Sequence, residues 1–215
     1  MAAEAPEPHL PLHVAAAGSA DGAELRRLAA ASPDAARAED AAGRLPLHWA
    51  CRRSAPGDAV TALLAAHPEG ARVRAAGGVL PLHAAAEAAG AADADAASCV
   101  EAVAALLAAA PEAAAAPDRL GRLPLHCAAA AGAPLGVVRA LLSAHRRGAG
   151  EPDGAGQTPA HAAAGAGARA ADVLALLLDV QPQARPSRGP SPPPRSAGAL
   201  AHCVPNALRD GTSAP

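Results

Sequence analysis

A Pro-Leu-His tripeptide recurs along the 215-residue chain and constrains its fold more than any other feature. Successive prolines lie 35, 35, 43 and 35 residues apart, so one interval carries an insertion of eight residues. Four full copies and one degenerate copy, Pro-Ala-His, begin at Pro11, Pro46, Pro81, Pro124 and Pro159. A fixed period of this length is typical of proteins built from one repeated supersecondary unit. The sequence therefore predicts about five such units.

Aliphatic residues repeat in register with the tripeptide. Leu or Val stands 14 residues after each proline, and Leu stands 17 residues after it, once the insertion is subtracted. The first set is Leu25, Val60, Val103, Val138 and Val173, and the second is Leu28, Leu63, Leu106, Leu141 and Leu176. In four units another Leu follows directly, and positions 14, 17 and 18 share one face of a helix. The pattern predicts a helix here, followed in most units by a proline that ends it: Pro33, Pro68, Pro111 and Pro182, with Arg146 in the fourth unit.

The residues around each tripeptide predict a turn followed by a first, shorter helix. Proline is favourable in the first turn of a helix, so we expect a helix of about nine residues to start at each one. A glycine stands three residues before four of the prolines and offers a positive φ: Gly43, Gly78, Gly121 and Gly156. Acidic residues are expected to cap the second helices, namely Asp21, Asp58 and Asp172. The insertion, near residues 88–97, is expected to form a surface loop between the two helices of the third unit.

The composition explains why such units must stack. The chain has 69 Ala but only 24 Leu and 11 Val, and it has no Ile, Phe or Tyr. Alanine buries little area, so the aliphatic burial of one unit is several times smaller than the entropy lost when about 35 residues become ordered. Neighbouring units must therefore bury one another's faces. We expect an all-α fold, a solenoid of about five helix-loop-helix repeats.

The motif resembles the ankyrin repeat. The family signature Thr-Pro-Leu-His-x-Ala is matched by Leu45-Pro46-Leu47-His48-Trp49-Ala50 and by Leu123-Pro124-Leu125-His126-Cys127-Ala128. The resemblance covers residues 9–182, in units of about 9–39, 40–74, 75–117, 118–152 and 153–182. Two features depart from the family. The period is 35 residues instead of 33, and Leu replaces the family's Thr at Leu10, Leu45, Leu80 and Leu123, whereas Thr158 keeps it. These leucines predict a turn held by apolar packing.

The resemblance implies a protein-interaction scaffold without catalytic activity. It implies that one or more partner proteins bind the turn tips and the first-helix face, which here carry Arg44, Arg52, Arg53, Glu87, Arg119, Leu120, Arg122 and Gln157. An alternative interpretation is that the charged residues among them are simply solvated and keep an Ala-rich chain soluble. An alternative function is a substrate-targeting or regulatory subunit of a kinase, phosphatase or ubiquitin ligase complex.

The histidines of the repeat (His13, His48, His83, His126 and His161) allow two interpretations. A metal ladder would need several ligands about 2 Å from one ion, whereas packed helices place one histidine per unit about 10 Å from the next. We therefore expect each imidazole to satisfy backbone groups of its own turn and of the adjacent turn. Trp49, the sole aromatic residue, is expected in the core, with a partner anchor as the alternative. No nucleophile or phosphate-binding motif occurs in a suitable context, so we expect no enzyme activity, cofactor, metal or small-molecule ligand.

Other expectations concern the ends of the chain and its surroundings. Residues 1–8 form a short lead-in, and the Pro/Arg-rich tail, 183–215, is expected to be disordered; its string Pro190–Arg195 resembles ligands of aromatic-lined grooves. A net charge of −2 and the near absence of aromatic residues argue against a nucleic-acid partner. The apolar stretches are too short for a membrane span. Four cysteines and no export signal favour the cytoplasm, with the nucleus as an alternative.

Overall fold

The structure is a computed structural model that describes residues 11–18, 22–92 and 94–180. Within these residues it contains helices and no strand, so the predicted all-α class is confirmed. The α-helices form five consecutive pairs: α1 (Pro11–Ala17) with α2 (Gly22–Ala31), α3 (Pro46–Arg52) with α4 (Gly57–Ala66), α5 (Pro81–Ala88) with α6 (Ala96–Ala109), α7 (Pro124–Ala131) with α8 (Leu135–Ala144), and α9 (Pro159–Gly165) with α10 (Ala171–Val180). The predictions for residues 1–8, Leu10, Asp21, Pro182 and 183–215 lie outside the described residues.

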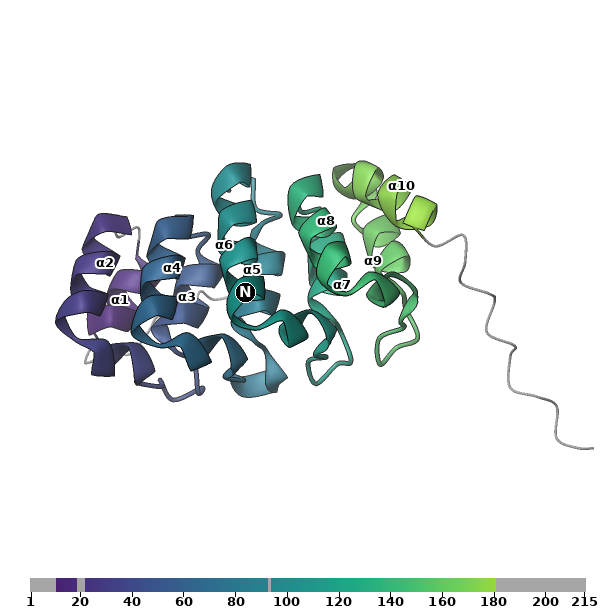
Figure 1. Ribbon diagram of the computed structural model, residues 1–215. Helices are drawn as coiled ribbons and strands as arrows, with labels where there is room; N and C mark the ends of the chain where they lie inside the picture. Colours follow the sequence, from purple (N-terminus) through teal and green to yellow (C-terminus); the bar gives the residue numbers. More distant parts are fainter. Residues whose placement is uncertain (1–10, 19–21, 93, 181–215) are drawn as a thin grey trace, which may run out of the picture. The chain divides into compact units, whose positions relative to one another are not determined.

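The pairs lie side by side and form two layers of helices (Figure 1). In one layer α1 contacts α3, α3 contacts α5, α5 contacts α7 and α7 contacts α9. In the other layer the contacts run from α2 through α4, α6 and α8 to α10. Each pair therefore buries its apolar face mainly against the pairs before and after it in the sequence.

Every odd-numbered helix begins at the proline of its tripeptide. The preceding residue is extended, for example Leu45 with φ −80° and ψ 163°, because the proline ring disfavours helical angles there. These helices are seven or eight residues long, slightly shorter than the nine expected. The small side chains that follow the histidine let neighbouring helices of this layer approach closely.

A short 3₁₀ helix follows the second helix in each of the first four pairs. Three of these begin at the predicted prolines, at Pro33, Pro68 and Pro111. In the fourth pair Arg146 begins an equivalent 3₁₀ helix, so the proline favours this turn but is not required for it. The predicted acidic caps are wrong for the described helices, since Pro56 caps α4 while Asp58 and Asp172 lie inside the first turns of α4 and α10. Asp58 instead pairs with Arg26 of α2 at 2.9 Å.

The insertion is only partly a loop. Helix α6 has 14 residues whereas α4 and α8 have ten, and it begins at Ala96, inside the segment expected to be loop. Asp95 caps it, because its side chain accepts a hydrogen bond from the backbone N–H of Ser98 at 2.9 Å. Alanine has the highest helix propensity, so a capped Ala-rich insertion adds about one turn to the helix.

The core follows the predicted periodicity. Once the insertion is subtracted, the residue 14 positions after each proline is buried in all five pairs, and the residue 17 positions after it is buried in the middle three. In the first and last pairs the latter residues, Leu28 and Leu176, are only half-buried. A pair at the end of the row has a neighbour on one side only, which explains this difference.

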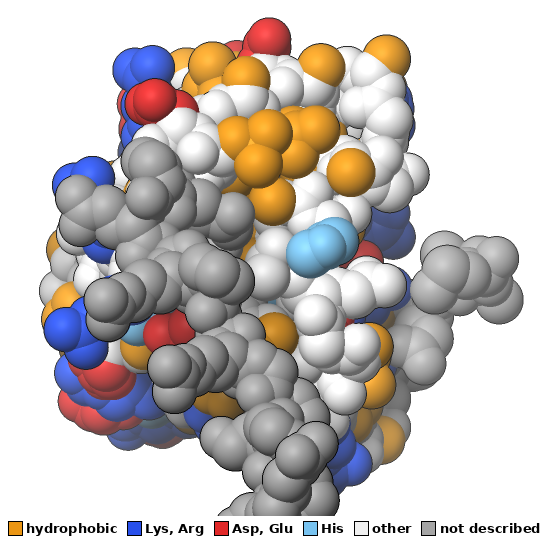
Figure 2. Space-filling view, turned by 90° about the vertical axis from the view of Figure 1, so that its right-hand side faces the viewer, with side chains coloured by type: hydrophobic (Ala, Val, Ile, Leu, Met, Phe, Trp, Pro, Cys, Tyr) orange, Lys and Arg blue, Asp and Glu red, His pale blue; other side chains and the backbone are white. Residues whose placement is uncertain are grey.

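The last pair leaves apolar surface exposed. Leu178 of α10 is 56% exposed, whereas the adjacent Leu177 is fully buried. Figure 2 looks onto this end and shows a group of hydrophobic side chains on its surface. No helix in the described ranges has both the length and the hydropathy needed to cross a bilayer.

Candidate functional site

The turns that precede the odd-numbered helices are joined in a row by backbone hydrogen bonds. The N–H of Ala76 donates to the carbonyl of Ala42, that of Arg119 to Gly77, and that of Gly154 to Leu120, each at 2.8 Å. The tips thus form one connected edge. We call this edge, together with the exposed side of the odd-numbered helices, the tip face; its tips are residues 41–44, 76–79, 119–122 and 154–157.

Glycine is required where the tips approach each other. The predicted positive φ is confirmed at Gly43, Gly78, Gly121 and Gly156, with values of 68–79°. At Gly121 a Cβ atom would lie 2.5 Å from the backbone nitrogen of Gly154, so the close approach excludes any side chain there. At Gly156 no atom lies within 4 Å of that position, and only the backbone angle favours glycine.

The histidines link each turn to the next. In the middle units the Nδ1 atom accepts a hydrogen bond from the backbone N–H three residues earlier, as His48 does from Leu45 at 3.1 Å. The Nε2 atom lies 2.9–3.3 Å from a carbonyl oxygen of the following turn. These pairs are His13 with Arg44, His48 with Val79, His83 with Arg122 and His126 with Gln157. Because Nδ1 accepts, the proton must lie on Nε2, which donates to the carbonyl.

The replacement of Thr by Leu leaves this connection intact. His161, in the degenerate unit, accepts from both the backbone N–H and the hydroxyl of Thr158, the latter at 2.8 Å. In the other units Leu45, Leu80 and Leu123 bury their side chains, and the histidine accepts only from the backbone N–H. The leucines thus exchange one hydroxyl hydrogen bond for apolar burial.

Burial keeps these imidazoles neutral. Desolvation lowers the pKa of His48 to about 4, and it also lowers the pKa values of His13, His83 and His126, although the carbonyl that each contacts acts in the opposite direction. A proton on Nδ1 would also remove the acceptor for the backbone N–H. These histidines therefore act as structural links, and the part of the chain that the structure describes holds no group of three or more His, Cys, Asp or Glu placed to bind a metal ion.

Two equivalent aspartates, Asp40 and Asp118, each organise one of the tips, and neither was among the predicted site residues. Asp40 Oδ1 accepts from the N–H groups of Ala42 and Arg44, both at 2.9 Å, and Oδ2 accepts from Arg44 Nε at 2.8 Å and from Trp49 Nε1 at 3.1 Å. Burial alone would raise the pKa of Asp40, but these hydrogen bonds hold it below its usual value.

Asp118 repeats the arrangement two units further along, where it binds the side chain of Arg122 through both Nε and Nη2 at 2.9 Å. Asp153 accepts only from backbone N–H groups, and the third unit has Ala75 at this position. The signal was present in the sequence, since an Asp stands six residues before the proline in three units.

The predicted partner-binding residues divide into two groups. Arg44 and Arg122 are half-buried and are held by Asp40 and Asp118, so they support the tips. The others are exposed on the tip face: Arg52, Arg53, Glu87, Arg119, Leu120 and Gln157. Leu120 is 62% exposed, which makes it the most exposed large apolar side chain among the described residues.

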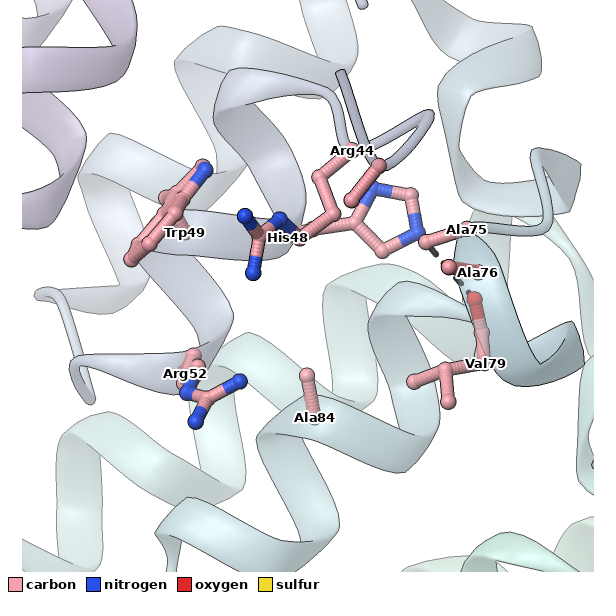
Figure 3. A pocket seen from close by; sticks show the side chains of 9 residues that line it. Arg44, His48, Trp49, Arg52, Ala75, Ala76, Val79 and Ala84 are labelled. Atoms are coloured by element: carbon pink, nitrogen blue, oxygen red, sulfur yellow. Dashed lines mark hydrogen bonds between the residues drawn. The ribbon is translucent and has the colours of Figure 1, made fainter. Parts of the chain in front are cut away.

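Trp49 is buried, as expected, but it also lines a cavity of about 200 Å³ between the second and third pairs. The guanidinium of Arg44 lies 4.4 Å from the centre of the indole ring, within the range of a cation–π contact. Figure 3 shows Arg44 and Arg52 projecting from the side of Trp49, with Val79 and Ala84 opposite.

A second cavity, of about 440 Å³, shares the lining residue Arg52 with the first and is also lined by Ala17 and Gly18 of the first unit. Arg53 and Ser54 form one side of it, and the extra turn of α6 contributes Asp95 and Ser98. Ser54 has a positive φ of 52°, and its hydroxyl donates to the carbonyl of Ala88 at 3.3 Å. The insertion therefore shapes the surface at the C-terminal ends of the odd-numbered helices, opposite the ends where the tips lie.

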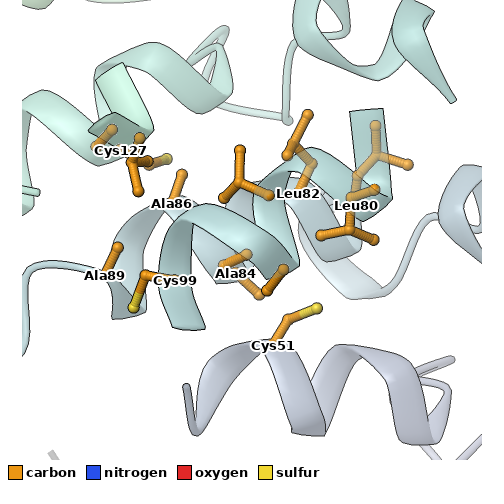
Figure 4. Close-up of a cluster of buried hydrophobic side chains, with 14 of the residues drawn as sticks. Cys51, Leu80, Leu82, Ala84, Ala86, Ala89, Cys99 and Cys127 are labelled. Carbon is orange, nitrogen blue, oxygen red and sulfur yellow. The ribbon is translucent and has the colours of Figure 1, made fainter. Parts of the chain in front are cut away.

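The described cysteines lie in the core and not at the cavities. Cys51, Cys99 and Cys127 are buried free thiols around α5 (Figure 4). Burial raises the pKa values of Cys51 and Cys127 to about 12 and also raises that of Cys99. Thiols that stay protonated at neutral pH are poor nucleophiles, so these residues act as small apolar side chains.

No protein-family model matches the chain, and no curated protein matches it.

Proposed function

We propose that this chain is an ankyrin-type solenoid that binds one or more partner proteins on its tip face and has no catalytic activity of its own. The observation that carries the proposal is the connected row of tips. Backbone hydrogen bonds and buried histidines hold the tips in fixed positions, while the side chains on their outer edge remain exposed. A rigid row of exposed side chains suits recognition, because little conformational entropy is lost on binding.

The chemistry of the buried groups supports a non-catalytic role. The described histidines of the core are neutral and bonded to backbone groups, and the described cysteines are protonated. The buried aspartates are fully engaged by the turns that they organise. We also place the protein in a reducing compartment, the cytoplasm or the nucleus, because its described cysteines are free thiols.

The test is crosslinking mass spectrometry in native extract with the full chain. A double variant at one tip, Arg119→Ser with Leu120→Ser, removes exposed side chains and leaves the backbone bond from Arg119 to Gly77 in place. Arg146→Ser, on the 3₁₀ helix after α8, is the matched control. We expect the tip variant to lose crosslinked partners that the wild type and the control retain. Equal recovery of partners by all three chains would contradict the proposed face.

A further inference from the structure

Two cavities share the side chain of Arg52 in their lining, and we call the two together the groove. The first lies between the second and third pairs, and the second lies at the C-terminal ends of the odd-numbered helices, where Ala17 and Gly18 of the first unit also line it. The first cavity is lined mainly by Trp49, Val79 and alanines, and the second mainly by polar side chains, including Arg53 and Ser98. An apolar compartment and a polar, cationic compartment thus lie next to each other.

Arg52 and Arg53 differ from Arg44, Arg74 and Arg122 because their side chains have no hydrogen-bonding or ionic partner among the described residues. Arg44 and Arg122 are paired with buried aspartates, and Arg74 donates to the carbonyls of Gly78 and Pro117. Arg52 and Arg53 are exposed and form no ion pair within the described ranges.

Two acidic side chains belong to the elements next to these arginines. Asp95 lines the second cavity, but its Oδ2 atom accepts from the backbone of Ser98. Glu87, on α5, is exposed and forms no ion pair with either arginine. Asp95 remains a carboxylate, but Arg52 and Arg53 together outweigh it, so the groove retains a net positive charge beside the apolar cavity.

The volume of the first cavity limits the kind of ligand that the groove can bind. A cavity of about 200 Å³ has room for a single side chain, whereas a whole helix is about 10–12 Å across. An extended chain can place one side chain in the apolar cavity and the next charged one on the arginines. The planar guanidinium suits a carboxylate, to which it can donate two parallel hydrogen bonds.

We propose that this groove binds an extended acidic segment of a partner protein, with an apolar side chain beside Trp49 and an adjacent Asp or Glu on Arg52 and Arg53. This inference rests on the proposed function and adds the chemistry of the partner. The extra turn of α6 forms the far wall of the second cavity, so the groove occurs where the insertion lies.

The sequence provides a direct probe of the site. Trp49 is the only Trp and the chain has no Tyr or Phe, so the intrinsic fluorescence of the full chain reports on the first cavity. The ligands are pools of blocked eight-residue peptides without aromatic residues. In the first pool each peptide has Glu at two fixed positions, and the other positions are randomised among Ala, Val, Leu and Ile. In two matched pools Gln or phosphoserine takes the place of both Glu residues. The variants are Arg52→Gln with Arg53→Gln, and Arg139→Gln on α8 as the control.

We expect the Glu pool to change the fluorescence of Trp49 and the Gln pool to bind at least about tenfold more weakly. The double Arg variant should weaken binding of the Glu pool about tenfold, the control should not, and added salt should weaken binding to the wild type. Equal binding of the Glu and Gln pools would overturn the proposal, as would preference for phosphoserine or no binding of any pool.

Glu4 and Glu7 of this chain carry the same chemistry as the proposed ligand, so a Glu4→Gln, Glu7→Gln variant is measured in parallel. If only this variant bound the Glu pool, the groove would be a site for the chain's own segment, and the proposal of a partner would fail. The crosslinking experiment distinguishes a failure of the groove proposal from a failure of the proposed function. Partners that depend on Arg119 and Leu120, together with no binding of the Glu pool, would refute the groove and leave the proposed function in place.

Discussion

The Nε2 atom of His83 donates to the carbonyl oxygen of Arg122, 39 residues further along the chain, at 3.0 Å. At the same time Nδ1 of His83 accepts from the backbone N–H of Leu80 at 3.3 Å. One buried side chain thus satisfies two backbone groups in two successive units, across the insertion. The same link recurs at His13, His48 and His126, so the spacing of the units is fixed by side-chain chemistry as well as by apolar packing.

The first prediction concerns this link. His83→Ala leaves a buried N–H and a carbonyl without their partner and opens a cavity, so we expect a loss of about 2–5 kcal/mol in the free energy of unfolding. The matched control is His161→Ala, because His161 is exposed and contacts only Thr158 of its own unit; its loss should stay below about 1 kcal/mol. Urea denaturation measures both, and similar losses for the two variants would refute the structural role of the link.

The second prediction concerns pH. The pKa of His48 is about 4 in the folded protein against 6.5 in the unfolded chain, so between these values the unfolded state binds more protons. The contribution of the neutral His48 to the free energy of unfolding is therefore fully present above pH 6.5. It decreases as the pH falls toward 4, by about 3 kcal/mol from His48 alone. His13, His83 and His126 have pKa values shifted in the same direction.

The two buried aspartates do not obscure this window. The pKa values of Asp40 and Asp118 lie below the usual 3.8, so their contribution is present above that value and is lost only at lower pH. Urea midpoints measured from pH 8 to pH 4 should fall below pH 6.5, and His48→Gln should reduce the slope. A midpoint that stays constant from pH 7 to pH 4.5 would show that the histidines are not buried as neutral groups.

The third prediction compares two adjacent leucines of α10. Leu177 is fully buried, whereas Leu178 is 56% exposed at the end of the row. Leu177→Ala should lower the free energy of unfolding by about 2–5 kcal/mol. Leu178→Ala, its matched control, should change it by less than about 1 kcal/mol. The reverse order, measured by thermal or urea denaturation, would mean that α10 is rotated relative to the structure.

The fourth prediction concerns the contact between tips. Gly121→Ala and Gly156→Ala both place a side chain on a residue with positive φ, which costs about 1–2 kcal/mol. Only at Gly121 would the new Cβ meet the backbone of Gly154, at 2.5 Å. We therefore expect the Gly121 variant to be the less stable of the two and to lose amide protection at Gly154 in hydrogen exchange. Equal stability would indicate that the tips are not in contact.

The sequence predicted those features that depend on local chemistry and on the period. The proline at the start of the first helix, the glycine with positive φ and the burial of the residue 14 positions later each follow from one residue type at one place in the unit. The acidic caps were placed wrongly because Asp58 was chosen for its residue type alone, whereas in the structure the helix begins earlier and Pro56 is the cap.

Other features were missed because they involve contacts between units. The first cavity, for example, joins side chains of the second and third pairs, and the second cavity also includes Ala17 and Gly18 of the first unit. The spacing of a repeat shows which positions are equivalent, but it does not show how two different units fill the space between them. The extra turn of α6 was a missed local signal, since Asp95 followed by alanines is a capped helix start.

The central structural claim is that each helix pair is stabilised mainly by its neighbours in the row. It is tested most directly by urea denaturation of chains that end after the third, fourth and fifth pairs, at residues 117, 152 and 182. The account predicts that the free energy of unfolding and its dependence on urea both rise with each added pair. A shortened chain as stable as the longest one, or a complete loss of folding on removal of the last pair, would contradict it.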